Sequence, residues 1–182
     1  PIMAGVSATF PMGLMILSTY VKPFIGQGAY FIWLFAIALH GILIVYFTVK
    51  FLLKYDQKNV FTTWFIVYVG IAVAGVTAPA YEKIGFGAAT FWFGLITLIP
   101  LLIIVIKRYR TLPSPDPAKP LVAIFAAPMS LCIAAYIQSV QVKNFTLLMT
   151  MFAVSTVLYV YSLVASLGLV KKFYPSFAGF TF

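Results

Sequence analysis

Side chains that could carry acid–base, nucleophilic or metal chemistry are scarce in this sequence. The 182 residues contain one histidine, one cysteine and three acids, and the acids, Asp56, Glu82 and Asp116, all fall between long apolar runs. The sequence has no paired carboxylates, no Cys/His spacing suited to a metal ion and no glycine-rich phosphate loop after a strand. We therefore predict that the protein is not an enzyme and has no cofactor and no metal site.

His40 lies midway along an apolar run, and no acidic residue lies inside any of the runs. Proton-coupled carriers usually hold an ionisable residue at membrane depth, because a proton must be bound and released there. A lone histidine among Leu39, Gly41 and Ile42 is also typical of a packed, hydrogen-bonded residue. The sequence leaves both interpretations open. The single cysteine, Cys132, allows no disulfide framework.

The composition is that of a membrane protein. Hydrophobic residues make up 63% of the sequence and charged residues 8%, and the mean hydropathy is +1.07. Three acids and twelve basic residues are too few to form the polar shell of a soluble domain of this size. The net charge of +9 does not indicate nucleic-acid binding, because the basic residues are spread through the connecting segments. We predict an integral membrane protein with no nucleic-acid partner.

Six apolar runs are long enough to cross a bilayer, which takes about 20 residues in a helix. They cover residues 4–21, 29–53, 62–79, 85–106, 120–139 and 145–170, and residues 175–182 begin a seventh. The runs lack the alternation of barrel strands, which predicts an all-α integral membrane protein with a single transmembrane domain over residues 1–182. The last run reaches only about 12 Å into a core about 30 Å thick, so we expect the chain to be part of a longer domain.

The basic residues orient the spans. Of the twelve Lys and Arg residues, nine lie in the connections around the ends of the second, fourth and sixth runs, and only Lys22, Lys83 and Lys143 lie in the others. By the positive-inside rule, the connections with nine basic residues face the cytoplasm. The first, third, fifth and seventh runs then lead away from the cytoplasm and the others return. We expect a multi-pass protein of the cell (plasma) membrane, built from helical hairpins.

A repeated sequence frame supports the hairpin as the repeating unit. The frame Pro-x-x-Ala opens three runs of the same direction, at residues 1–4, 120–123 and 175–178. Two of these runs carry a second proline, Pro11 and Pro128, and a proline inside a helix bends it. These spans therefore share a way of starting and a place to bend.

Small residues are concentrated in the same like-directed spans. The run 62–79 has no proline in its middle, and its flexible points are Gly70 and Gly75. One interpretation is close helix packing, which small residues permit in lipid. The other is a lumen between the bent helices, while bulky residues such as Trp33 and Trp92 on the returning helices face lipid. A lumen without fixed charge and with basic mouths would favour anions through its electrostatic potential. Both interpretations can hold for different faces of one helix.

Four stretches carry a resemblance to a known family. They are VSATFPMG at 6–13, WFIVYVG at 64–70, AAPMSL at 126–131 and PSFAGFTF at 175–182. In this order they resemble the tellurite-resistance/dicarboxylate transporter (TDT) family, which includes bacterial TehA and the plant slow anion channels. The resemblance covers essentially the whole chain, and the inner helices of that family correspond to the spans that the basic residues make parallel.

The resemblance implies ten helices in five hairpins around a pseudo-fivefold axis, with a homotrimer as the usual assembly. The first helix of each hairpin would line a central pore, and a phenylalanine of the ninth helix would close it. The present spans would be the third to ninth helices, with two helices before Pro1 and the rest of the domain after Phe182. By the Phe-Thr-Phe motif, we assign the gating phenylalanine to Phe182. The run 62–79 departs from the family pattern because it lacks a mid-helix proline.

Aligning the repeated frames relates the expected pore residues to one another. Phe182 falls at the position of Ala127, just before the kink at Pro128, and Phe10 holds the same position before Pro11. A small side chain at this level would leave a lumen open, and a phenylalanine would close it. The expected pore-lining residues are Phe10, Thr9, Gly70, Ala74, Ala127, Ser130 and Phe180, with Phe182 as the gate and helix kinks at Pro11 and Pro128.

The leading functional hypothesis is an anion channel that conducts small inorganic or organic anions through this pore. A secondary carrier for dicarboxylate, sulfite or tellurite-like anions is the alternative, and a membrane scaffold without transport is a third possibility. The resemblance does not fix the ion, because it implies chloride and nitrate conduction, dicarboxylate uptake, sulfite efflux and tellurite resistance in different members.

Overall fold

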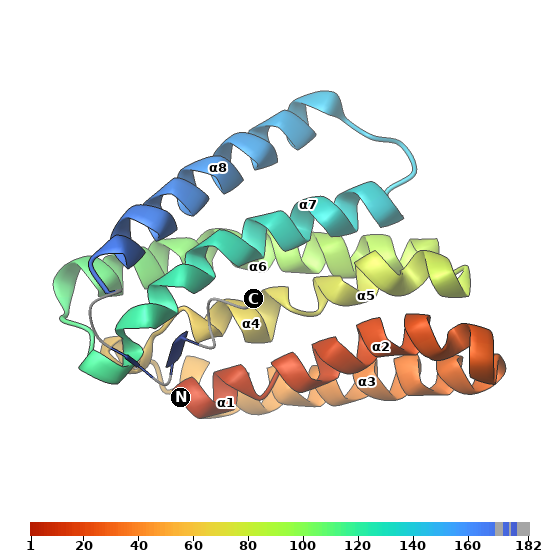
Figure 1. The fold of residues 1–182 in the computed structure, drawn as a ribbon, viewed down its shortest axis with the longest axis horizontal. Helices are drawn as coiled ribbons and strands as arrows, with labels where there is room; N and C mark the ends of the chain where they lie inside the picture. Colours follow the sequence, from red (N-terminus) through yellow and green to blue (C-terminus); the bar gives the residue numbers. More distant parts are fainter. Residues whose placement is uncertain (170–172, 175, 178–182) are drawn as a thin grey trace.

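Helices form the regular structure of the described residues, which are 1–169, 173–174 and 176–177 of a computed structural model (Figure 1). Within them, five helical segments are each long and apolar enough to cross a membrane, and a bent pair of shorter helices makes a sixth span. The all-α membrane fold and the six predicted spans are confirmed. The seventh predicted run, 175–182, lies outside the described residues except for residues 176 and 177.

The elements follow the predicted runs closely. In chain order they are α1 (Ile2–Val6), α2 (Thr9–Ile25), α3 (Gln27–Phe47), the π-helical turn η1 (Thr48–Leu52), the 3₁₀ turn η2 (Gln57–Asn59), α4 (Thr63–Val69), α5 (Ala72–Thr77), the 3₁₀ turn η3 (Ala78–Tyr81), α6 (Ile84–Thr111), the 3₁₀ segment η4 (Asp116–Ala126), α7 (Ala127–Ser139) and α8 (Phe145–Leu167). The largest difference is at the end of α6, which continues past Ile106 to Thr111. Lys107, Arg108 and Arg110 end the apolar run there, but lysine and arginine are good helix formers and need not end the helix.

The spans pair into three hairpins, α1–α2 with α3, α4–α5 with α6, and η4–α7 with α8 (Figure 1). Each hairpin turns by a different local device. Gly26 has φ 54°, which glycine adopts easily, and Glu82 is left-handed with φ 57°. In the third turn, the Asn144 side chain accepts a hydrogen bond from the Leu147 N–H at 3.1 Å and caps α8. The first helices of the three hairpins therefore run in the same direction.

The bent span α4–α5 lies at the centre of the described bundle. Every residue of 60–75 is buried, and the span contacts α1, α2, α3, α6 and α7. By contrast, α3, α6 and α8 expose bulky apolar side chains, among them Phe35, Ile103 and Phe152. In a membrane such side chains contact lipid. Trp92 is 45% exposed, as expected, but the expectation that Trp33 faces lipid is wrong: it is 1% exposed, because it packs against Tyr81 and donates a hydrogen bond to Thr77 of the neighbouring hairpin.

Two of the like-directed spans change their hydrogen bonding just before a proline. Pro11 has no N–H to donate to the Ser7 carbonyl oxygen, which instead accepts from Phe10 N–H at 3.2 Å, where α1 gives way to α2. Pro128 likewise has no N–H for the Ile124 carbonyl oxygen, which accepts from the residue three positions on, where the 3₁₀ segment η4 becomes α7. Proline chemistry thus interrupts both spans near their middle.

Candidate functional site

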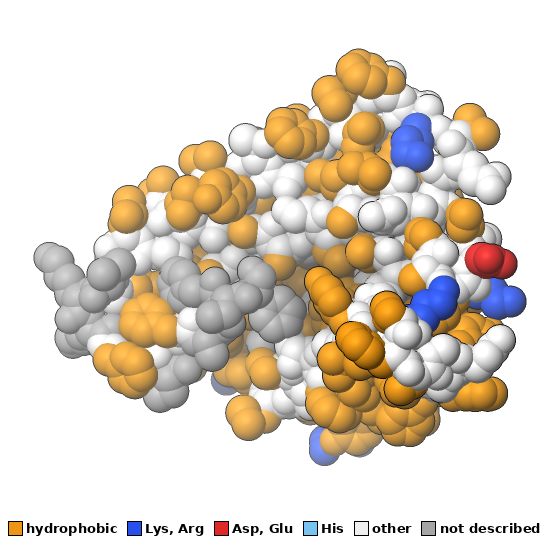
Figure 2. All heavy atoms as spheres, turned by 45° about the vertical axis from the view of Figure 1, so that its right-hand side comes forward, with side chains coloured by type: hydrophobic (Ala, Val, Ile, Leu, Met, Phe, Trp, Pro, Cys, Tyr) orange, Lys and Arg blue, Asp and Glu red, His pale blue; other side chains and the backbone are white. Residues whose placement is uncertain are grey.

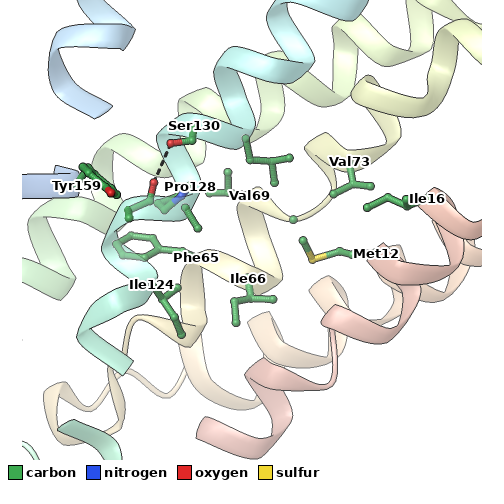
Figure 3. A pocket seen from close by; sticks show the side chains of 14 residues that line it. Met12, Ile16, Phe65, Ile66, Val69, Val73, Ile124, Pro128, Ser130 and Tyr159 are labelled. Carbon is green, nitrogen blue, oxygen red and sulfur yellow. Dashed lines mark hydrogen bonds between the residues drawn. The ribbon is translucent and has the colours of Figure 1, made fainter. Parts of the chain in front are cut away.

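A cavity of about 440 Å³ opens among the three interrupted spans (Figure 3). Its lining comes from α2 (Met12, Ile16), from α4–α5 and the break between them (Phe65, Ile66, Val69, Gly70, Val73), from η4 and α7 (Ile124, Ala126, Ala127, Pro128, Ser130, Leu131) and from α8 (Tyr159). One water molecule needs about 10–15 Å³ of such space, so the cavity is large enough for a small anion with several waters.

Three of the expected pore-lining residues do line this cavity, namely Gly70, Ala127 and Ser130. Gly70 lies at the break between α4 and α5, and the other two lie in the first turn of α7. Pro128 also lines the cavity, whereas Pro11 is buried beside its neighbour Met12. The cavity therefore meets all three spans at the level where they are interrupted.

Other expected pore residues lie elsewhere in the structure. Phe10 is 61% exposed and Thr9 is half-buried, and neither lines the cavity. The reason is helical geometry, since Phe10 and Met12 are separated by about 200° around α2. Ala74 is fully buried in packing and does not reach the cavity. Phe180 and Phe182, the expected gate, lie outside the described residues.

Sequence reasoning missed the bulky part of the wall. Met12, Phe65, Val69 and Tyr159 point toward the cavity in Figure 3. For Met12 a signal existed, since it directly follows the kink proline Pro11. For the others, a large apolar side chain in an apolar run is equally consistent with a lumen, a core or lipid, so the sequence carries no signal.

The remaining small residues of α5 serve close packing. A Cβ atom on Gly75 would lie 2.9 Å from the Gly87 carbonyl oxygen and 3.1 Å from Ala135 Cβ, and a Cβ atom on Gly87 would lie 2.2 Å from Ser139 Oγ. Ser139 also donates a hydrogen bond to the Gly75 carbonyl oxygen. Helices α5, α6 and α7 thus touch through glycine and serine, as small residues permit in lipid. Within this span Gly75 faces the packed helices, whereas Gly70 faces the cavity.

Polar groups in the cavity are limited to hydroxyls and backbone. Ser130 Oγ donates to the Ala126 carbonyl oxygen at 2.9 Å and lies 2.9 Å from Ser155 Oγ of α8. Ser155 is buried behind Ser130, so the two serines form a short hydrogen-bonded pair at the edge of an otherwise apolar wall. No Lys, Arg, Asp or Glu is among the described residues that line the cavity.

His40 lies behind the break in the central span. The α4 and α5–η3 parts of that span meet at 47°, across Gly70 and Ile71, without a proline at the break. The imidazole is completely buried and its Nε2 donates to the Val67 carbonyl oxygen at 2.9 Å, in the last turn of α4. A Cβ atom on Gly70 would lie 3.0 Å from His40 Cε1 and 2.6 Å from Met12 Sδ. His40 is therefore a packed, hydrogen-bonded residue that braces the break, and its Nδ1 has no hydrogen-bond partner among the described residues.

Arg108 is a buried cation at the far end of α6, with 2% of its surface exposed. Its Nη1 donates to the Leu112 carbonyl oxygen at 3.2 Å and to Ser114 Oγ at 2.9 Å. Its guanidinium carbon lies 4.7 Å from the centre of the Phe61 ring and 5.2 Å from that of Tyr109. Carbonyl, hydroxyl and ring partners position the guanidinium without neutralising it, so this end of the bundle keeps a positive potential.

Comparison with known families and proteins identifies the chain at the level of its family. The SLAC1 family, described as voltage-dependent anion channel, matches residues 1–182, which is the whole chain. No curated protein and no solved structure matches it. The apolar helices and this match together make it a multi-pass membrane protein of an anion-transport family. The chain belongs to the SLAC1 family, which is the TDT family that its four sequence stretches resemble.

Proposed function

We propose that the protein is an anion channel and that the cavity among α2, α4–α5 and η4–α7 is part of its lumen. The proposal depends mainly on the wall of that cavity, where three like-directed spans meet at the level of their interruptions and no charged side chain of the described residues is present. Conduction requires an ion to be held weakly enough to leave, and a wall of apolar side chains and one serine pair suits this requirement. Membership of the SLAC1 family supports anion transport.

Selection for anions would come from the two basic ends and not from a tight site in the middle. Arg108 keeps its charge at one end, and Lys22 and Lys83 lie at the other. Such potentials raise the local concentration of anions and repel cations. By the positive-inside rule, the end with Arg108 faces the cytoplasm and the end with the hairpin turns faces outward.

The gate and the assembly belong to the same proposal. Phe182 closes the pore, with Phe180 beside it in the wall, inside a ten-helix domain of five hairpins that forms a homotrimer. The support is the family resemblance and the repeated frame, which aligns Phe182 with Ala127, a residue that lines the cavity. In the full-length protein, Phe182→Ala should raise the anion current measured by voltage clamp. An unchanged current would remove Phe182 from the gate.

A test of the lumen itself uses the described residues. Ala127→Phe introduces a ring into the cavity and should abolish most of the anion current of the full-length protein in a planar bilayer. Ile137→Phe is the matched control, because Ile137 is an exposed apolar residue of the same helix, α7. A current that survives Ala127→Phe undiminished would show that this cavity is not on the conduction path.

The second candidate function is a secondary carrier for dicarboxylate, sulfite or tellurite-like anions. It is favoured by one observation, the buried imidazole of His40 with an unpartnered Nδ1 beside the lumen wall, since such a nitrogen can bind a proton. Voltage-clamp recording and radiolabelled uptake under an imposed pH gradient separate the two functions. Saturable, gradient-driven uptake without a channel-sized current would exclude the channel. If neither uptake nor current is measured, only the membrane scaffold without transport remains.

A further inference from the structure

A second cavity, of about 480 Å³, lies between the α2–α3 turn and the η3–α6 turn. Lys22 and Tyr30 line it from the first hairpin, and Tyr81, Glu82 and Lys83 line it from the second. Figure 2 brings this end of the bundle forward and shows basic side chains close to an acidic one, with apolar side chains over the flanks. Neither hairpin forms this cavity alone.

The two lysines cross between the hairpins. Lys22 donates to the carbonyl oxygen of Ala80 and its Nζ lies 5.4 Å from the centre of the Tyr81 ring, so it reaches the second hairpin. Lys83 reaches back to the first, where its Nζ lies 5.9 Å from the centre of the Tyr30 ring. A carbonyl and two ring faces attract an ammonium group but do not neutralise it. Both charges are therefore held at the walls of the cavity.

The rings beneath the lysines are themselves fixed. Tyr81 donates to the Ala29 carbonyl oxygen at 3.3 Å, and Trp33 donates to Thr77 Oγ1 at 2.8 Å. The rings of Trp33 and Tyr81 lie 5.0 Å apart, and those of Tyr30 and Tyr81 lie 5.6 Å apart. These hydrogen bonds and ring contacts together hold the three rings of Tyr30, Trp33 and Tyr81 in fixed positions. Lys22 and Lys83 are themselves exposed, and each ammonium group lies near a ring whose position is fixed.

The charges of this cavity do not cancel. Within the described part of the chain, neither lysine forms an ion pair, although the exposed Glu82 lines the same cavity. Two ammonium groups and one carboxylate leave a net positive charge at the wall. We propose that this cavity is a vestibule for a small anion, where Lys22 and Lys83 concentrate the transported anion before it enters the lumen. This inference rests on the proposed function.

The effect of the lysines on anion access depends on the salt concentration, because the charges lie some distance from the lumen cavity. Along α2, Lys22 is six residues from Ile16, which lines the lumen cavity, and six residues of helix span about 9 Å. Charges act over about 10 Å at 0.1 M salt but over about 30 Å at 0.01 M. The vestibule should therefore raise anion access strongly in dilute salt and weakly in concentrated salt.

The experiment measures anion current through the full-length protein in phosphatidylcholine bilayers, with anions supplied from one side at a time. In about 10 mM chloride, Lys22→Gln should lower the current from the vestibule side about twofold, because it removes one unit charge about 10 Å from the lumen. Lys83→Gln should lower it by less, because Lys83 is ten residues from Val73, the last residue of its span that lines the lumen cavity, against six residues for Lys22. The current from the opposite side should not change, and the difference should disappear at high salt. Lys22→Arg and Lys83→Arg keep the charge and should keep the current.

Lys143→Gln is the matched control, because Lys143 lies at the same end but donates to Val140 of its own hairpin, at 3.1 Å, outside this cavity. An equal loss of anion current in Lys143→Gln would mean that general surface charge causes the effect, and it would refute the vestibule proposal. A loss that occurs only when anionic lipid is added would assign the site to a lipid phosphate and overturn it also.

A second readout does not depend on transport. Millimolar chloride or nitrate should slow the acylation of Lys22 and Lys83 by a water-soluble amine reagent, measured by mass spectrometry, and should leave Lys143 unaffected. If the anion protects the lysines from acylation but no anion current is measured, the anion site is supported and the channel function is refuted. If current is measured without protection, the channel function is supported and the anion site is refuted.

Discussion

Gly70→Ala would place a methyl group in the break of the central span. The backbone does not require glycine there, because φ −57° and ψ −25° suit any residue. The surroundings do require it, since a Cβ atom would lie 2.2 Å from the Ile66 carbonyl oxygen, 2.6 Å from Met12 Sδ and 3.0 Å from His40 Cε1. The Met12 thioether can move aside. The carbonyl belongs to α4, and the imidazole is tied to the same helix through its bond to Val67.

The energetic effect follows from these distances. Overpacking a filled site costs about 1–3 kcal/mol, while alanine in place of glycine in a helix gains about 0.5–1 kcal/mol. The net expectation is a loss of about 1–2 kcal/mol in the free energy of unfolding, which changes the ratio of unfolded to folded protein about 5–30-fold. If α4 and α5 change their angle to make room, the cavity that Gly70 lines changes shape and the anion current falls as well.

Reversible denaturant unfolding of the full-length protein in mixed micelles provides the assay, followed through the fluorescence of the buried Trp33 and Trp64. Gly13→Ala and Gly41→Ala are matched controls, since these glycines neighbour Met12 and His40 in sequence but a Cβ atom on either meets nothing within 4 Å. They should be neutral or slightly stabilising. A Gly70→Ala variant as stable as Gly41→Ala would refute the account of the break as a filled junction.

Three further predictions concern polar groups. His40→Leu removes the hydrogen-bond donor in the break and should lower the free energy of unfolding by about 1–3 kcal/mol, measured in the same micelles; a loss of gradient-driven uptake with unchanged stability would instead assign a proton role. Arg108→Leu removes the hydrogen bonds to the loop after α6 and should speed proteolysis of that loop, whereas Arg110→Leu, which is exposed, should not. Ser155→Ala leaves Ser130, which lines the cavity, with one partner fewer and should change the ratio of nitrate to chloride current, while Thr156→Ala, which removes a hydrogen bond within one helix, should leave the ratio unchanged.

The sequence predicted the spans well because a run of about 20 apolar residues has few alternatives to a membrane helix. Their ends were harder to place. Hydropathy stops at Ile106, but α6 continues to Thr111, because a helix is ended by backbone chemistry and not by charge. The run 120–139 begins earlier as the 3₁₀ segment η4, from Asp116, since its first residues include Pro117 and Pro120, which favour turns over a regular helix.

The candidate site was predictable only where a residue type restricts the backbone or the space. Gly70, Ala127 and Ser130 are small residues at or beside the interruptions, and they line the cavity. Ala74 is equally small but faces the packed side of α5, because the face that a residue takes depends on the rotation of its helix in the bundle. The break at Gly70 has no proline to mark it, and its brace, His40, comes from another hairpin. No local pattern contains that contact.

The central span is also kept away from the bilayer. Because every residue of 60–75 is enclosed by protein, α4 and the start of α5 have no face that must match the thickness of the hydrocarbon layer. The surrounding helices match the thickness of the hydrocarbon layer instead. One of them is α6, whose 28 residues extend about 42 Å and can tilt in a core about 30 Å thick. A membrane that thins or thickens would therefore tilt the outer helices while the junction at Gly70 keeps its geometry. The cavity beside Gly70 can then keep its shape in lipids of different chain length.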